Sequence, residues 1–155
     1  MELRVGGVSK KEFITKLLVY SSLYGLLHVN YIDLVVPGSS IAGYHLWLII
    51  QYFTPFVPLL FIFGLKDWEL VLSMGLLASL YNDLFYYPIG ILLLNEEVDL
   101  LDWYRFQFGL KGFEVKWFFN GGFFTIPVSS ILMGLSIYAR IIAVAYLCYK
   151  WWIEE

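Results

Sequence analysis

The stretch from Trp68 to Leu94 reads WELVLSMGLLASLYNDLFYYPIGILLL. It is apolar over most of its length, and as a helix it is long enough to cross a bilayer core, which needs about 20 residues. Asp83 stands inside it, where an ionisable side chain costs roughly 2.5–3.5 kcal/mol on insertion scales. The stretch therefore predicts a membrane span, and Asp83 becomes the first candidate functional residue.

The composition of the whole chain agrees with a membrane protein. The chain has 155 residues, of which 60 % are hydrophobic and 15 % are charged. A soluble domain of this size has too small an interior for so many apolar side chains, so we expect lipids to cover much of the surface. The net charge is −3 and no extended basic patch occurs, which gives no support for nucleic-acid binding. The low numbers of Asn, Gln and Cys suggest a thermophile, and a prokaryotic cell membrane is the expected location.

Four stretches are apolar and near the length of a span, which predicts an all-α, integral membrane four-transmembrane-helix bundle formed by a single domain, residues 1–155. The segment between the third and fourth spans interleaves aromatic residues with acids. This pattern predicts a short interfacial helix, or a cap over the mouth of the bundle. The four spans are expected at about 13–35, 44–65, 68–94 and 124–148.

The distribution of Lys and Arg predicts the orientation of the bundle. With an even number of spans, both termini lie on one side, together with the connection between the second and third spans. Six basic residues fall on that side and three on the other, so the positive-inside rule places both termini in the cytoplasm. The first set is Arg4, Lys10, Lys11, Lys16, Lys66 and Lys150, and the second is Arg105, Lys111 and Lys116.

In this orientation, most polar residues within the spans fall in the outer half of the membrane, which predicts one polar pocket that opens outward. The leading hypothesis is a site that binds, or binds and chemically modifies, a lipid-like or isoprenoid-like molecule. Asp83 and His28 are the candidate catalytic groups, as an acid or base in an apolar environment. The candidate binding residues are Asn30, Asp33, His45, Tyr81, Asn82 and Arg140.

Several alternatives remain open at this stage. The chain is also compatible with a non-catalytic subunit of a larger membrane complex, or with a homo-oligomer, because small residues recur at four-residue spacing and permit close helix contacts. The two histidines, His28 and His45, are candidate ligands of a haem or metal, although no E-x-x-H spacing accompanies them. Asp83 and Arg140 suit a small ion or proton transporter, or form an ion pair that only fixes the helices. The cofactor, if any, and the question of catalysis stay undetermined.

Overall fold

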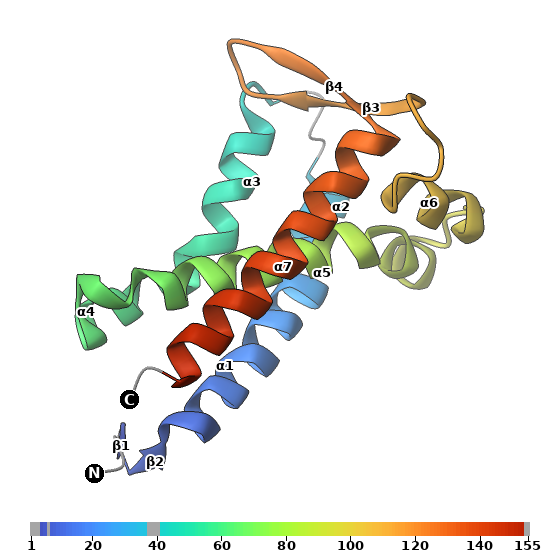
Figure 1. Ribbon diagram of the computed structural model, residues 1–155. Coiled ribbons are helices and arrows are strands. Elements are labelled where there is room, and N and C mark those ends of the chain that lie inside the picture. Colours follow the sequence, from blue (N-terminus) through green and yellow to red (C-terminus); the bar gives the residue numbers. More distant parts are fainter. Residues whose placement is uncertain (1–3, 6, 37–40, 154–155) are drawn as a thin grey trace.

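The computed structural model describes residues 4–5, 7–36 and 41–153, and this described part is mostly helical, at 75 % (Figure 1). Three helices are long and apolar enough to cross a membrane: Tyr44–Phe63, Trp68–Leu94 and Ser130–Ile153. Only 17 to 28 % of the most apolar window of each is buried within the chain. Most of their apolar surface therefore faces outward, as expected for helices that lipids surround.

The first helical segment consists of α1 (Lys10–Leu23), a π-helical turn (Tyr24–Val29) and α2 (Asn30–Val35). Ser9 caps its start, with its hydroxyl accepting a hydrogen bond from the Glu12 amide at 3.3 Å. The segment lies against α5 (Trp68–Leu94). At this contact Gly25 meets the backbone of Ala78 so closely that a Cβ atom would clash with the Ala78 carbonyl. A small residue at position 25 is therefore what lets the two helices approach.

The second segment bends at its prolines. It consists of α3 (Tyr44–Phe53), a 3-10 turn (Thr54–Phe56) and α4 (Pro58–Phe63), and a second 3-10 turn (Leu65–Asp67) leads into α5. Within α5, Pro88 cannot donate to the carbonyl of Leu84 one turn earlier. The hydroxyl of Tyr104 donates to this carbonyl at 3.0 Å, so a neighbouring side chain replaces the lost hydrogen bond.

The connection between α5 and the last helix contains more structure than the sequence predicted. The expected short helix is present as α6 (Leu100–Gln107), but a β-hairpin follows it, formed by β3 (Val115–Asn120) and β4 (Thr125–Ser129). The last helix, α7, spans Ser130–Ile153. The predicted start of the fourth span near Phe124 was therefore wrong, because the residues before Ser130 pair with β3, and the helix extends beyond the predicted end at 148. Gly122, with φ of +86°, lies in the turn that reverses the chain direction.

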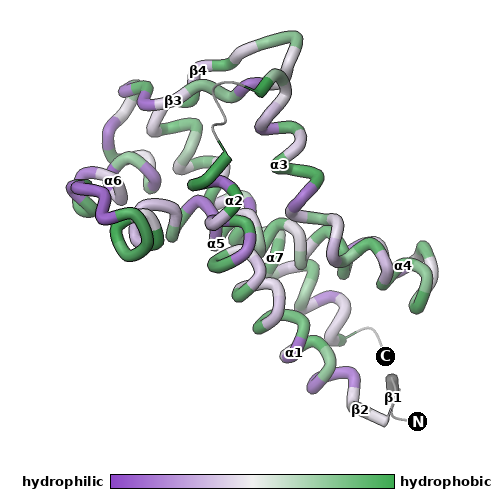
Figure 2. The backbone as a smooth tube through the Cα atoms, turned by 180° about the vertical axis from the view of Figure 1, so that it is seen from behind, coloured by the Kyte–Doolittle hydropathy of each residue, from purple (hydrophilic) through white to green (hydrophobic). Residues whose placement is uncertain are grey.

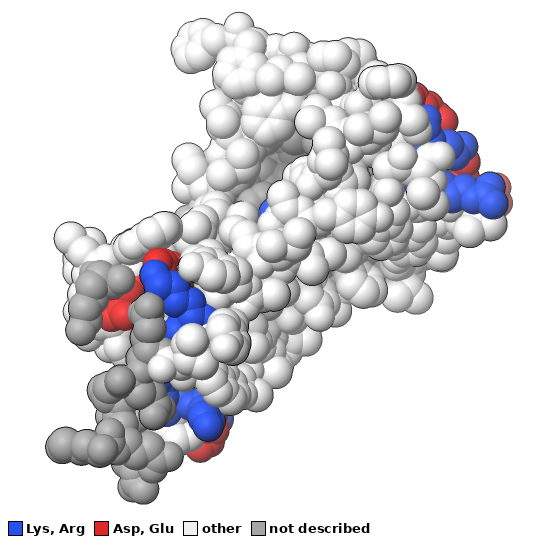
Figure 3. All heavy atoms as spheres, in the orientation of Figure 1, with Lys and Arg blue, Asp and Glu red and all other residues white. Residues whose placement is uncertain are grey.

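The helices run between two ends of the molecule, and both described chain ends lie at the same one (Figure 1). There the Lys10 ammonium lies 4.6 Å from the ring centre of Trp151. On the face shown in Figure 3, charged side chains gather at this end and at the opposite end near α6, and the surface between is almost free of charge. Hydrophilic residues are likewise frequent on α6 and sparse on α4 in Figure 2. This distribution matches a molecule whose middle lies in hydrocarbon.

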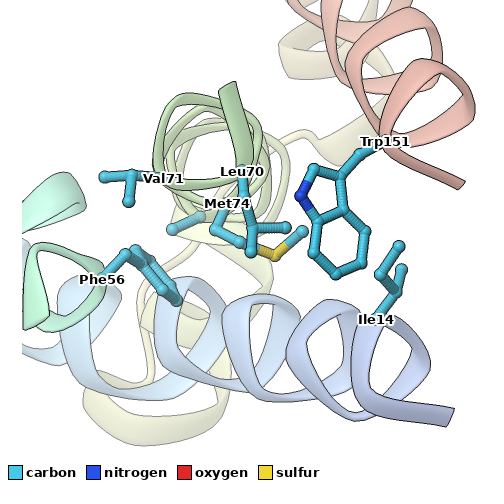
Figure 4. Close-up of a cluster of buried hydrophobic side chains, with 7 residues drawn as sticks. Ile14, Phe56, Leu70, Val71, Met74 and Trp151 are labelled. Atoms are coloured by element: carbon cyan, nitrogen blue, oxygen red, sulfur yellow. The ribbon is translucent and has the colours of Figure 1, made fainter. Parts of the chain in front are cut away.

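One hydrophobic cluster ties the first segment to the three long helices near the chain termini (Figure 4). Ile14 from α1 and Trp151 from α7 meet Met74 from α5, and Phe56 joins from the bend after α3. Because Met74 has no exposed surface and Ile14 only 1 %, this contact is fully packed. The first segment thus packs into the same hydrophobic core as the three long helices.

Candidate functional site

A cavity of about 1550 Å³ lies between α3, α5 and α7, with the β3–β4 hairpin over one end. Side chains from all these elements and from α6 form its wall, which is mostly apolar. On the face shown in Figure 3, a hollow is visible between α3 and α7, with a basic side chain at its floor. The hollow lies in the part of the surface that carries almost no charge.

Asp83 and Arg140 form an ion pair in the wall of this cavity. The Arg140 Nη1 atom lies 2.6 Å from a carboxylate oxygen of Asp83, and the side chains are 15 % and 24 % exposed. Arg140 also donates from Nη1 to the Ser79 hydroxyl at 3.0 Å and from Nε to the Ser136 carbonyl at 3.2 Å. The two predicted site residues are therefore brought together and neutralise one another, which reduces the cost of holding each charge away from water.

Asn82 is the centre of a second polar group, which joins three helical segments. Its amide nitrogen donates to the Asn30 side-chain oxygen at 2.8 Å and to Asp33 at 3.2 Å, and its oxygen accepts from Tyr52 at 2.6 Å. Asp33 also accepts a hydrogen bond from the hydroxyl of Tyr44. Asn30 and Asp33 are three residues apart and share a helix face, since both contact the same Asn82 amide.

His45 lies at the end of the cavity that the hairpin covers. The backbone N–H of Asn120 donates to its Nδ1 at 2.7 Å, and the ring stacks on Trp117 and Phe119 with centres 5.3 and 5.2 Å away. Because Nδ1 accepts a hydrogen bond, a neutral imidazole here carries its proton on Nε2. Asn120 further holds the hairpin in place, because its side-chain oxygen accepts from the Gly43 N–H at 3.2 Å. His45 and Asn120 thus attach the hairpin to the start of α3.

The side chains of two predicted residues lie apart from this group. His28 is exposed and stacks on Tyr24 at 5.1 Å, and it is not part of the cavity wall. The Tyr81 ring stacks on Phe85 at 5.5 Å and also lies outside that wall. The sequence predicted that His28 and Asp83 share one polar pocket as catalytic groups. In the structure these two side chains are not brought together. In the described part of the chain, no three His, Cys, Asp or Glu side chains group as a metal would require.

Part of the acidic segment outside the spans is paired as well. Asp102 on α6 bonds to Lys111, and its other carboxylate oxygen lies 2.6 Å from the Lys116 ammonium. These hydrogen bonds, first from Lys111 and then from Lys116, lower the pKa of Asp102 to about 2. The bond to Asp102 in turn raises the pKa of Lys111. Asp102 is thus an anchor between α6 and the residues that lead into the hairpin.

The polar residues of the cavity wall that were not predicted include Tyr44 and Tyr52 on α3, and Trp103 and Gln107 on α6. The two tyrosines belong to an aromatic-rich helix, and its sequence does not distinguish the aromatic residues that face the cavity from the others. Trp103 and Gln107 are four residues apart, so they share a face of the helix, and this spacing could have been read from the sequence.

The sequence matches no protein family, and neither a characterised protein nor a solved structure shows detectable similarity to it.

Proposed function

We propose that this chain is an integral membrane protein with four spans, in which the first helical segment crosses beside the three apolar helices. Its packing against α5 and in the shared core supports this assignment. The common position of both chain ends supports an even number of crossings. The excess of Lys and Arg on that side favours termini in the cytoplasm of a prokaryotic cell.

The proposed function is to bind an amphiphilic, lipid-like or isoprenoid-like molecule in the cavity between α3, α5 and α7. The observation that carries this proposal is the cavity itself: about 1550 Å³, with apolar walls and a few fixed polar groups. Sites for drug-sized ligands usually measure about 300–1,000 Å³, so the space suits a longer, lipid-sized molecule. The hollow between α3 and α7 in the uncharged belt supports a route for such a molecule from the membrane.

If the protein also modifies its ligand, Asp83 is the candidate acid or base, because it lines the cavity beside Arg140. Asp33 and His45 are the other titratable groups of the predicted set in the cavity wall. His28 has no place in this chemistry, since it is exposed elsewhere.

Native mass spectrometry of the protein, extracted gently from its own membranes, tests the binding proposal. We expect one amphiphile per chain, released on activation and identifiable by its mass. Ser136, in the cavity wall on α7, offers a way to block the site, and Ser136→Phe should remove the bound molecule. Ala139→Phe adds the same ring to an exposed position of α7 outside the cavity wall, and it should retain the molecule.

A second candidate is a non-catalytic subunit whose partner helix occupies the hollow between α3 and α7. The exposed apolar residues on both helices favour it, among them Ile50 at 61 % and Leu135 at 61 %. In that case the same preparation contains one reproducible protein partner and no amphiphile, and Ser136→Phe releases the partner. This result would contradict the ligand-binding proposal.

A further inference from the structure

We propose that the polar head of the bound molecule is uncharged and carries a hydroxyl, and that Trp103 and Gln107 on α6 bind it. This inference rests on the proposed function, because it assigns a head-group subsite within the same cavity. The rest of the molecule then extends from α6 along α5 and α7 toward the hollow between α3 and α7.

The side chains of Trp103 and Gln107 lack the hydrogen bonds that buried polar groups normally make. Both belong to the cavity wall, and they are 8 % and 1 % exposed. Among the described residues, Trp103 Nε1 and both terminal atoms of Gln107 are buried without a partner within the protein. Leaving such atoms unpaired is unfavourable, and native proteins rarely do so without a functional reason. Three unpaired atoms on one face of one short helix indicate a partner from outside the chain.

The charges of the cavity wall favour an uncharged head. Four charged side chains belong to the cavity wall, and three of them are in ion pairs: Asp83 with Arg140, and Lys116 with Asp102. The fourth, Asp33, accepts hydrogen bonds from two neutral groups in the polar cluster around Asn82. Each charged group of the described cavity wall therefore already has partners, so none is left over there to neutralise a charged head, and burying an unpaired charge is costly.

The two side chains together complement a hydroxyl group. Trp103 Nε1–H is a donor only, whereas the Gln107 amide has two donor hydrogens and one acceptor oxygen. A hydroxyl oxygen accepts from Trp103 while its hydrogen is donated to Gln107 Oε1. Because these atoms are covered by neighbouring groups, the side chain of Gln107 must rotate toward the cavity when the head arrives.

The position of α6 is fixed well enough to present such a subsite. The Trp103 ring packs edge-on against Tyr87 of α5, with centres 4.4 Å apart. Tyr87 follows Asp83 by one helical turn and so lies on the same face of α5. The subsite therefore lies beyond the ion pair, at the α6 end of the cavity. The Tyr104–Leu84 hydrogen bond, at 3.0 Å, attaches α6 to α5 from its other side.

Three radiolabelled probes with the same sixteen-carbon chain test the inference: hexadecanol, hexadecylammonium and hexadecyl phosphate. Binding is measured to the full-length protein in lipid nanodiscs. We expect hexadecanol to bind most tightly. Gln107→Leu and Trp103→Phe should each weaken its binding on the order of tenfold, the value of one lost hydrogen bond of about 1.4 kcal/mol. The matched controls are Gln51→Leu and Trp47→Phe, two α3 positions outside the cavity wall, which should bind hexadecanol as the wild type does.

Thermal unfolding of the same variants without probe separates a binding role from a structural one. Because Gln107 has no partner in the free protein, Gln107→Leu should leave the melting temperature unchanged or raise it while binding falls. A melting temperature that falls together with binding would show that Gln107 supports the fold instead, and would overturn the assignment.

The remaining outcomes are equally distinct. If hexadecanol binds to the wild type and to both α6 variants alike, the subsite is wrong while the cavity proposal stands. If hexadecylammonium binds best and Asp33→Asn removes that preference, the head lies at Asp33 and is cationic, which overturns the inference. If none of the probes binds and no amphiphile is retained from native membranes, the proposed function itself fails.

Discussion

Replacing Asn82 tests how much the buried polar cluster contributes to the stability of the bundle. Asn82 is 1 % exposed and makes three side-chain hydrogen bonds, to Asn30, Asp33 and Tyr52. Hydrogen bonds between membrane helices contribute about 0.6 kcal/mol each on average. The three together therefore contribute about 2 kcal/mol, and we expect Asn82→Leu to lower the free energy of unfolding by about this amount.

A double-mutant cycle with Tyr52→Phe makes this prediction specific. Tyr52→Phe alone removes the 2.6 Å bond to Asn82 and should cost about 0.6 kcal/mol. In the Asn82→Leu background this bond is already absent, so adding Tyr52→Phe should cost nothing further. The free energies come from reversible unfolding in mixed micelles with increasing SDS, followed by circular dichroism. If the two costs simply add, the side chains are not coupled and the described cluster does not hold α3 to α5.

Three further predictions concern the ion pairs and the topology. Asp83→Asn or Arg140→Gln alone should lower the free energy of unfolding by about 2–3 kcal/mol, which is less than for a fully buried pair because both side chains are partly exposed to the cavity. The double variant Asp83→Leu with Arg140→Met should recover most of this loss in the same assay. If neither single variant loses stability, the ion pair is not formed. Asp102 has its pKa lowered to about 2 by its bonds to Lys111 and Lys116, against about 3.9 in an unfolded chain, so its stabilising effect is complete above pH 4 and is lost as the pH falls toward 2. Asp102→Asn should therefore lower the melting temperature at pH 6 but not at pH 2, and an equal difference at both values would contradict this role. Epitope tags at the two termini should both be accessible to antibody only after the cells are permeabilised, whereas one tag accessible on intact cells would exclude four spans.

The bundle helices could be predicted because long apolar runs are the strongest structural signal in a sequence. The helix Trp68–Leu94 has the predicted bounds, since Asp67 and Asn95 interrupt the apolar run at both ends. The start of the last predicted span was wrong because Phe123 to Val128 is also apolar, and apolarity alone does not separate a strand from a helix. The Gly121–Gly122 pair between aromatic and β-branched residues is a hairpin signal that could have located β3 and β4.

The site was predictable only in part. The residues Asp83, Asn82 and Arg140 stand out because polar side chains in spans are rare, and the structure places all three in one cavity wall. His28 stands out for the same reason, yet it is exposed, because the face of a helix that meets its neighbours depends on packing. The π-helical turn Tyr24–Val29 also changes the direction in which the side chains within and after it point around the helix axis. No local sequence pattern predicts this turn. Trp103 and Gln107 belong to a segment outside the spans, and only the packing of α6 against α5 brings them to the cavity.

The most direct test of the proposed ligand in the cavity is a cryo-electron microscopy map of the protein extracted gently from its own membranes. A bound antibody fragment makes the particle large enough to image. We expect an elongated density between α3, α5 and α7 that is not part of the chain, with one end beside Trp103 and Gln107. A map in which α3 and α7 close on one another, or in which a helix of another protein fills the hollow, would contradict it.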